Sequence, residues 1–213
     1  MKRRIAAVVM MLMMLALTGC GSDGSTTVIV TSPTIATQII STQSIDGDIA
    51  PAITPQIVQG GTSVSAGIDP LTLAEYRAFL HFPLGGAGGV PPNATIVSAT
   101  LRIFINDIRP SVGTIPFFID LISFPPPTLI VSDFSRASLR TISTSIFQSD
   151  FGNYVDIDVT PLMQEAQLPP ALPDFQIRIR EDLISVGPGL IDGIITIDDT
   201  TVARAPRLSV TYF

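Results

Sequence analysis

The stretch that decides the fold is Ile96–Asp107, which reads IVSATLRIFIND. Apolar and polar side chains alternate along most of it, and this period of two is typical of a half-buried β-strand. The apolar parity, which we expect to face a core, consists of Val97, Ala99, Leu101, Ile103 and Ile105. The polar parity, which we expect to face solvent, includes Ser98, Thr100, Arg102 and Asn106.

The same alternation recurs in three later runs, at Tyr154–Val159, Phe175–Arg180 and Arg207–Tyr212. Each run places Val, Ile, Leu or Phe on one parity and mostly polar or charged residues on the other. Tyr76–Leu84 is instead apolar on both parities apart from Arg77 and His81, which is typical of a central strand. The chain is therefore expected to form several strands that share one core.

Breakers separate these runs, among them the Gly-rich segment 85–89 and the Pro-rich segment 125–127. One helical stretch is expected at Thr160–Gln167, with Thr160 as N-cap and Pro161 at the first helical position. Many short strands with Gly and Pro turns favour a sandwich. We predict an all-β fold, an antiparallel jelly-roll β-sandwich with one short crossover helix, preceded by a signal peptide and a flexible tether.

The N-terminus has the layout of a targeting segment. Lys2, Arg3 and Arg4 precede the apolar run Ile5–Leu17, whose 13 residues are too few to span a bilayer as a helix, which takes about 20. Residues 17–20, Leu-Thr-Gly-Cys, resemble the lipobox of bacterial lipoproteins. The resemblance implies a signal peptide over residues 1–19, lipid such as palmitate on Cys20 and, because Gly21 follows, anchoring at the bacterial outer membrane, periplasmic or surface-facing. The alternative is an ordinary secretory signal that contains a Cys.

Residues 20–44 contain 11 Ser or Thr and no aromatic residue, which is typical of a mobile tether. Two short apolar segments interrupt this tether, at residues 28–30 and 39–40, and one of them is expected to dock as an edge strand. The β-sandwich domain is predicted to span residues 45–213.

Charge and composition exclude several function classes. Without residues 1–19, nine Arg stand against 18 acidic residues, a net charge of −9, so binding to nucleic acid is not expected. One Cys and one His, Cys20 and His81, leave no disulfide framework, no CxxC site and no His-based metal cluster. His81 is expected to be a packed or hydrogen-bonded strand residue.

Five segments, in order, resemble one bacterial extracellular family, the jelly-roll domains called DNRLRE domain or carbohydrate-binding module family 96. The segments are Tyr76–Leu84, Val90–Ile103, Asp156–Thr160, Phe175–Arg180 and Ala205–Tyr212. The first is similar to the family's R-x-hydrophobic-L-x-F-x-L strand, the second to P-x-G-A-T-V-x-S-A-T-L-R-L, and the last to R-P-x-L-V-V-T-Y. The resemblance runs from about Ser44 to Phe213 and implies a jelly-roll fold that binds carbohydrate.

Four residues are candidates for ligand binding: Arg102, Tyr154, Arg178 and Arg180. The three Arg would form a platform for the carboxylates of uronate sugars, since a guanidinium pairs with a carboxylate through two hydrogen bonds. Tyr154 would stack on a sugar ring. The alternative, which we favour for Arg178 and Arg180, is a cross-strand charge ladder with the alternating acids Asp156 and Asp158.

Asp192, Asp198 and Asp199 flank an apolar run and are candidate ligands of a structural calcium, a cation that prefers oxygen donors. Solvated turn acids are the alternative, because no EF-hand spacing is present. No other cofactor is expected.

The sequence as a whole predicts a lipid-anchored, extracytoplasmic, non-catalytic module that binds carbohydrate or another cell-surface polymer. Its partners would be the membrane, through the lipid on Cys20, and a polysaccharide. The alternative is a structural or adhesive module that binds a surface protein and no sugar. A polysaccharide-acting enzyme ranks third, because glycoside hydrolysis needs only two carboxylates.

Overall fold

The computed structural model describes residues 33–51, 54–110, 112–184, 192–200 and 202–213. The predicted signal peptide, Cys20 and the first apolar segment of the tether, residues 28–30, lie outside these described residues. Within them, no helix is long and apolar enough to cross a membrane.

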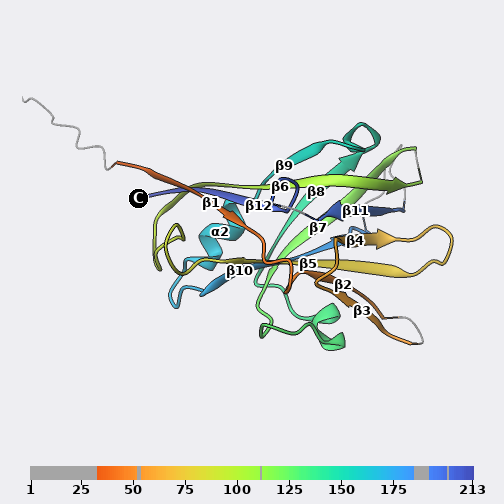
Figure 1. Ribbon diagram of the computed structural model, residues 1–213, viewed down its shortest axis with the longest axis horizontal. Helices are drawn as coiled ribbons and strands as arrows, with labels where there is room; N and C mark the ends of the chain where they lie inside the picture. Colours follow the sequence, from red (N-terminus) through yellow and green to blue (C-terminus); the bar gives the residue numbers. More distant parts are fainter. Residues whose placement is uncertain (1–32, 52–53, 111, 185–191, 201) are drawn as a thin grey trace, which may run out of the picture. The chain divides into compact units, whose positions relative to one another are not determined.

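The described chain is mostly antiparallel β-structure (Figure 1). The strands are β1 (Ile35–Ile40), β2 (Gly47–Ala50), β3 (Gln56–Gln59), β4 (Ser63–Ile68), β5 (Glu75–Pro83), β6 (Ile96–Arg109), β7 (Thr114–Ile122), β8 (Arg140–Phe147), β9 (Tyr154–Asp158), β10 (Asp174–Glu181), β11 (Ile194–Asp198) and β12 (Arg207–Tyr212). They join in one curled sheet with the order β1-β12-β6-β11-β4-β5-β10-β7-β8, while β2 pairs with β3 and β5, and β9 pairs with β6. The predicted all-β sandwich class is confirmed, and β5 is the central strand expected from its two apolar parities.

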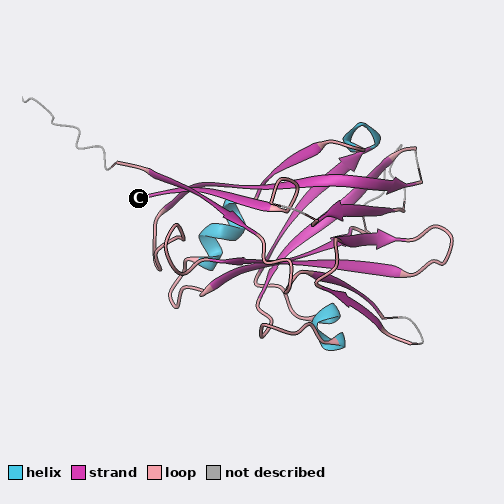
Figure 2. Ribbon diagram, in the orientation of Figure 1, coloured by secondary structure: helices cyan, strands magenta, loops and turns pink. Residues whose placement is uncertain are grey.

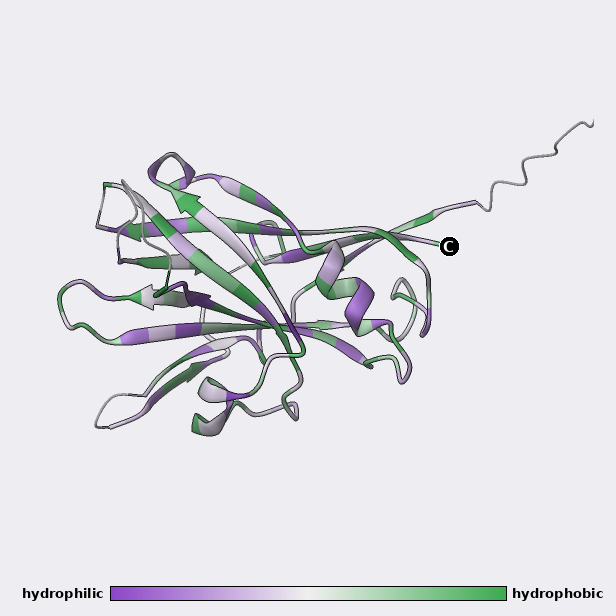
Figure 3. Cartoon of the chain, turned by 180° about the vertical axis from the view of Figure 1, so that it is seen from behind, coloured by the Kyte–Doolittle hydropathy of each residue, from purple (hydrophilic) through white to green (hydrophobic). Residues whose placement is uncertain are grey.

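The curl brings the inner faces of β6 and β10 onto one core. Leu101 and Ile103 of β6 belong to the same buried cluster as Phe175 and Ile177 of β10. Hydrophobic and hydrophilic positions alternate along the strands (Figure 3). The only α-helix of the described residues, α2 (Thr160–Ala166), packs buried residues such as Met163 against this cluster. Figure 2 shows helical segments in cyan among the strands.

The alternation predicted for β6 fails at its first residue. Val97 is 48% exposed and Ile96 is buried in its place. The register against β12 shifts here, since Thr211 lies opposite Ser98 and Tyr212 opposite Ile96, so that Val97 has no partner on β12. This bulge turns Ile96 inward.

The helix begins as predicted, but Thr160 is not its N-cap. Val159 is the N-cap, and Pro161 lies in the first turn. The Thr160 hydroxyl accepts a hydrogen bond from the backbone N–H of Ala99 at 2.9 Å, and Asp158 accepts the N–H of Thr160 at 2.9 Å. The side chain thus ties the helix to β6.

Part of the segment predicted as a tether is a strand. β1 pairs along its whole length with β12, with Ile35 opposite Tyr212 and Ile40 opposite Arg207. The short apolar segment Ile39-Ile40 therefore docks as part of an edge strand, and Ile39 is buried. The sheet begins ten residues before the predicted domain boundary at residue 45.

A further layer covers the outer face of β10, which the sequence pattern did not predict. A second apolar cluster joins Ile49 of β2, Phe79 of β5, Ile122 of β7, and Phe124 and Leu129 of the β7–β8 connection. The connection contains the 3-10 helix η2 (Val131–Ser135), and a second 3-10 helix, η3 (Gln148–Asp150), follows β8. β10 is therefore buried on both faces.

Gly67 of β4 packs tightly against the backbone of Gly193, the residue before β11. Its φ is +112°, and a Cβ atom there would lie 2.0 Å from the carbonyl oxygen of Gly193. We expect Gly67→Ala to lower the free energy of unfolding by more than the roughly 1–3 kcal/mol of backbone strain, because the atoms also collide. Denaturant unfolding measures the loss. The control Gly85→Ala, where a Cβ meets nothing within 4 Å, should change stability little, and an equal loss in both variants would contradict this geometry.

Candidate functional site

Arg102 and Asp156 form an exposed ion pair on the outer face of β6 and β9. The residues lie directly opposite one another across the two strands. Arg102 Nε and Nη2 donate to the two carboxylate oxygens at 2.6 and 2.7 Å. Their side chains are 49% and 48% exposed. The pair is therefore well formed and open to a ligand.

Tyr154 lies beside this pair, two residues before Asp156 on β9. Its ring meets that of Phe104 edge to face, with centroids 5.0 Å apart, and the Arg102 guanidinium carbon lies 5.8 Å from its ring centre. Its hydroxyl donates to the carbonyl oxygen of Ala203 at 2.8 Å. These contacts hold the ring in place while 48% of the residue stays exposed.

Phe104 packs against the Tyr154 ring and supports it. It stands on the polar parity of β6, yet it is almost buried, because Tyr154 covers it on one side and the Arg204 guanidinium lies 4.3 Å from its ring centre. We call Arg102, Phe104, Tyr154, Asp156 and Arg204 the β6–β9 face. The structure thus brings together Arg102 and Tyr154, two of the four predicted ligand-binding residues.

The charges of the β6–β9 face are largely compensated. Hydrogen bonds from Arg102, and then its charge, hold the pKa of Asp156 below its ordinary value. The hydrogen bond to Asp156 in turn raises the pKa of Arg102. Both groups are ionised at neutral pH, and they offer donors and acceptors without a large net charge.

Two further exposed aromatic residues, Phe147 and Phe151, were not predicted. They are 52% and 54% exposed and flank η3, just before β9. The signal was present in the sequence, because two Phe enclose the polar turn residues 148–150. The segment 147–154 therefore carries three half-exposed aromatic side chains.

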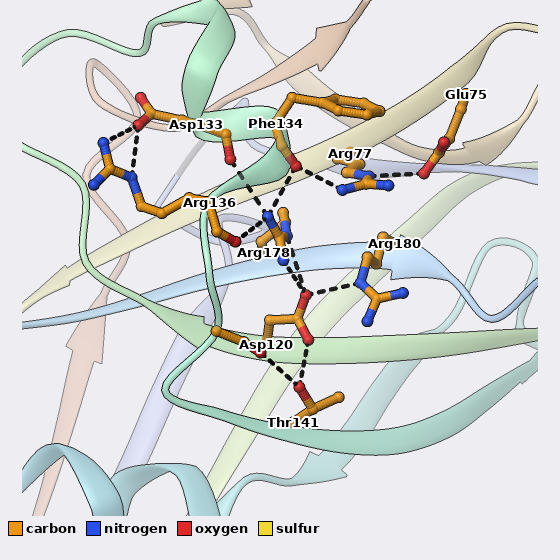
Figure 4. A network of polar contacts seen from close by, with 10 residues as sticks. Glu75, Arg77, Asp120, Asp133, Phe134, Arg136, Thr141, Arg178 and Arg180 are labelled. Atoms are coloured by element: carbon orange, nitrogen blue, oxygen red, sulfur yellow. Dashed lines mark hydrogen bonds and ion pairs between the residues drawn. The ribbon is translucent and has the colours of Figure 1, made fainter.

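Arg178 and Arg180 lie elsewhere, and the predicted charge ladder is wrong. β9 pairs with β6, whereas β10 pairs with β5 and β7, so Asp156 and Asp158 are not opposite these Arg. Their partner is Asp120 of β7: Arg178 Nη2 and Arg180 Nε donate to its Oδ2 at 2.6 and 2.8 Å (Figure 4).

Arg178 is also not a solvent-facing platform, because the β7–β8 connection covers it. Only 4% of the residue is exposed. Its Nη1 donates to the carbonyl oxygens of Phe134 and Arg136, both at 2.8 Å, and Arg77 donates to the same Phe134 oxygen at 2.6 Å (Figure 4). The guanidinium thus fastens the connection to the sheet, which is a structural role.

Asp120 neutralises Arg178 inside the protein. Burial alone would raise the pKa of Asp120. Hydrogen bonds from Arg180, Thr141 and Arg178 outweigh the effect of burial, so the pKa of Asp120 falls below its ordinary value. The Thr141 hydroxyl donates to Oδ1 at 2.6 Å. The carboxylate therefore stays charged and matches the buried cation.

The three predicted calcium ligands do not converge. Asp192 is exposed and raises the pKa of Glu181, whereas Asp198 accepts hydrogen bonds from Thr200 N and Oγ1 at 2.8 and 2.5 Å. Asp199 is buried beside Ser41. Over the described part of the chain, no group of three or more His, Cys, Asp or Glu is arranged to hold a metal ion.

His81 is buried in β5, as expected for a packed strand residue. Its Nδ1 lies 3.2 Å from the hydroxyl of Thr42, and its Nε2 lies 3.5 Å from a carboxylate oxygen of Asp174. Its backbone N–H donates to Asp46 at 2.7 Å. These contacts tie β5 to the connection between β1 and β2.

Comparison with protein-family models and with curated proteins finds no match to this chain.

The buried Arg178–Asp120 pair and the exposed Arg102–Asp156 pair together test how burial changes the contribution of an ion pair to stability. We expect Arg178→Met to lower the free energy of unfolding by about 3–5 kcal/mol, because it removes the buried partner of Asp120 and leaves the carbonyl oxygen of Arg136 without its donor. The exposed pair is the control, and Arg102→Ala should cost at most about 1 kcal/mol. Denaturant unfolding measures both changes. A small loss at Arg178 would show that the buried network is not structural.

Glu181 makes stability depend on pH. Burial, and then the charge of Asp192, raise its pKa to about 8, and its oxygens accept the backbone N–H groups of Ile68 and Gly193 at 2.9 and 3.2 Å. The folded state therefore keeps a proton that the unfolded state releases above its ordinary pKa of 4.5. Stability from this group is complete below that pKa and is lost as the pH rises toward 8.

We expect Glu181→Gln to remove this part of the pH dependence. Between about pH 5 and 8, the unfolding free energy of the natural protein should fall more steeply than that of the variant, by about 1.4 kcal/mol per pH unit for one proton. Unfolding at a series of pH values measures the two slopes. Parallel slopes would mean that Glu181 ionises normally in the folded protein.

Proposed function

We propose that residues 33–213 form a non-catalytic module that binds carbohydrate, and that the β6–β9 face is the contact surface. The observation that carries the proposal is the exposed ring of Tyr154, held rigidly beside the exposed Arg102–Asp156 pair. A fixed aromatic ring next to polar groups that both donate and accept suits the apolar face and the hydroxyls of a sugar ring.

Tyr154 supplies the apolar half of this contact. The C–H faces of a pyranose ring are apolar, and they pack on an aromatic ring with little entropy loss when that ring is already fixed. The contact with Phe104 and the hydrogen bond to Ala203 fix the ring before any ligand arrives.

Arg102 and Asp156 supply the polar half. The carboxylate has remaining lone pairs and the guanidinium has remaining N–H groups, so both are able to bind sugar hydroxyls without separating. Because Asp156 already compensates the charge of Arg102, the face favours neutral sugars over the uronates expected from a free Arg platform. The acidic balance of the chain acts in the same direction.

Two sequence observations support the proposal. The motifs at Tyr76–Leu84 and Val90–Ile103 resemble those of the DNRLRE domain, or carbohydrate-binding module family 96. The N-terminal motif that ends at Cys20 resembles a lipobox. We therefore place the module at the bacterial outer membrane, held by lipid on Cys20, with its binding face available to polysaccharide.

Substitution of Tyr154 tests the proposal. A glycan array first identifies a ligand among neutral and uronic polysaccharides, and calorimetry with its oligosaccharide then measures affinity. We expect neutral glycans to bind and Tyr154→Ala to weaken binding at least about tenfold, which corresponds to 1.4 kcal/mol. Tyr154→Phe is the matched control, because it keeps the ring and its contact with Phe104 and loses the hydroxyl with its hydrogen bond to Ala203.

The opposite results are equally informative. Unchanged binding by Tyr154→Ala would move the contact away from the β6–β9 face, and blank wells across the array would contradict carbohydrate binding. Release of reducing ends from any bound polysaccharide would show that the module is an enzyme.

A protein-binding, adhesive module is the second candidate, and the apolar loop tips at one end of the sandwich favour it. Leu71 and Leu73 between β4 and β5, Val112 between β6 and β7, and Ile184 after β10 are 68–84% exposed. The Asp69–Arg109 ion pair, at 3.8 Å, joins two of these turns. Binding to a surface protein that is lost in Leu71→Ser/Leu73→Ser, together with a blank glycan array, would favour this candidate.

A further inference from the structure

Two buried carboxylates, Asp46 and Asp199, each keep one oxygen without a partner. Asp46 is fully buried, and Asp199 is 1% exposed. The Oδ2 atom of each receives no hydrogen bond from any described residue. Buried polar atoms are almost always satisfied in folded proteins, so two unsatisfied carboxylate oxygens in one place point to an ordered water or a bound ion.

The two side chains belong to one polar site, framed by three segments that are distant in sequence. Ser41 and Asp46 lie in the connection between β1 and β2, and Asp199 directly follows β11. Ser41 Oγ donates to Asp199 Oδ1 at 3.5 Å, and Gly60 N–H donates to the backbone oxygen of Asp46 at 2.9 Å. Asp199 N–H donates to the oxygen of Thr62 at 2.9 Å.

The charges of the pair are uncompensated within this frame. Both carboxylates are buried, and neither forms an ion pair with a described residue, so their ionised forms are costly. The neighbouring cation, Arg204, approaches Asp198 rather than the pair, with Nη1 at 3.5 Å. A bound cation would reverse this cost.

A pocket reaches this site from the surface on the side of Ser41 and Asp199, and Asp46 lies outside its lining. It has a volume of about 300 Å³, and its walls include Ser41, Asp199, Thr200 and Val202. Thr200 and Val202 are exposed at its rim. Arg and Lys are absent from its described lining, so no cation of the protein competes with an ion that enters.

We propose that Asp46, Asp199 and Ser41 bind one calcium ion, which joins the β1–β2 connection to the end of β11. The ligands are hard oxygen donors: two carboxylates and one hydroxyl. Calcium accepts six to eight such donors in flexible geometry, and water from the pocket supplies the remaining positions. Magnesium requires a nearly ideal octahedron at shorter distances, whereas calcium tolerates flexible geometry, so comparison of the two ions is part of the test.

The site differs from the one predicted from sequence. It retains Asp199, adds Asp46 and Ser41, and excludes Asp192 and Asp198, whose carboxylates serve other contacts. With only two carboxylates, it is consistent with the finding that no three acidic residues form a metal group in the described residues.

Thermal unfolding of the full chain in detergent at neutral pH tests the proposal. Calcium should raise the melting temperature over that in chelator by roughly 4–8 °C, more than equimolar magnesium does. Equilibrium dialysis should find one calcium per chain.

Asp46→Asn and Asp199→Asn should each abolish the calcium-dependent rise. Both variants should melt at or above the natural protein in chelator, since a buried charge has been removed. Asp192→Asn is the control and should keep the full response. If a variant fails to fold, dialysis of the natural protein still decides.

Three results would overturn the site. The first is no bound calcium at millimolar concentration. The second is a melting temperature that ignores calcium but rises on acidification, because the two carboxyls would then share a proton. The third is a calcium response that Asp192→Asn abolishes and Asp46→Asn leaves intact.

Discussion

The pairing of Arg178 with Asp120 is the interaction on which the outer layer of this protein depends. A β-strand buried on both faces has no room for an uncompensated cation, and Arg178 is stable there only because Asp120 is ionised beside it. The same guanidinium then holds three carbonyl oxygens of the β7–β8 connection. That connection covers the second apolar cluster. The Asp120 carboxylate, by neutralising Arg178, therefore holds the β7–β8 connection against the sheet.

Much of the fold was predictable, because the alternation of side chains is a local property. Leu101, Ile103, Phe175 and Ile177 point inward as their parity requires. Exceptions arise where a distant part of the chain decides. Val97 turns outward because β12 skips it, and the outward parity of β10 is buried because the β7–β8 connection folds over it, with contacts 42–45 residues apart in sequence. Strand pairing is a long-range property, so the sequence assigned Arg178 and Arg180 to the wrong acids.

The candidate sites follow the same division. Tyr154 and Asp156 lie on one short strand, and their common face was visible from their spacing. Their meeting with Arg102 and Phe104 depends on the pairing of β6 with β9. Asp46 and Asp199 lie near opposite ends of the domain's sequence, and no spacing pattern in the sequence links them. Only the folded chain shows two unpartnered carboxylate oxygens in one site.

Under the proposed function, Arg102 faces the ligand, whereas Arg178 is buried and faces the protein. Backbone amide NMR during titration with a neutral oligosaccharide tests this difference most directly. We predict shift changes that centre on residues 102–104 and 154–156 and leave β10 unchanged. Changes centred on Arg178 and Arg180, or on the loop tips near Leu71, would contradict this prediction.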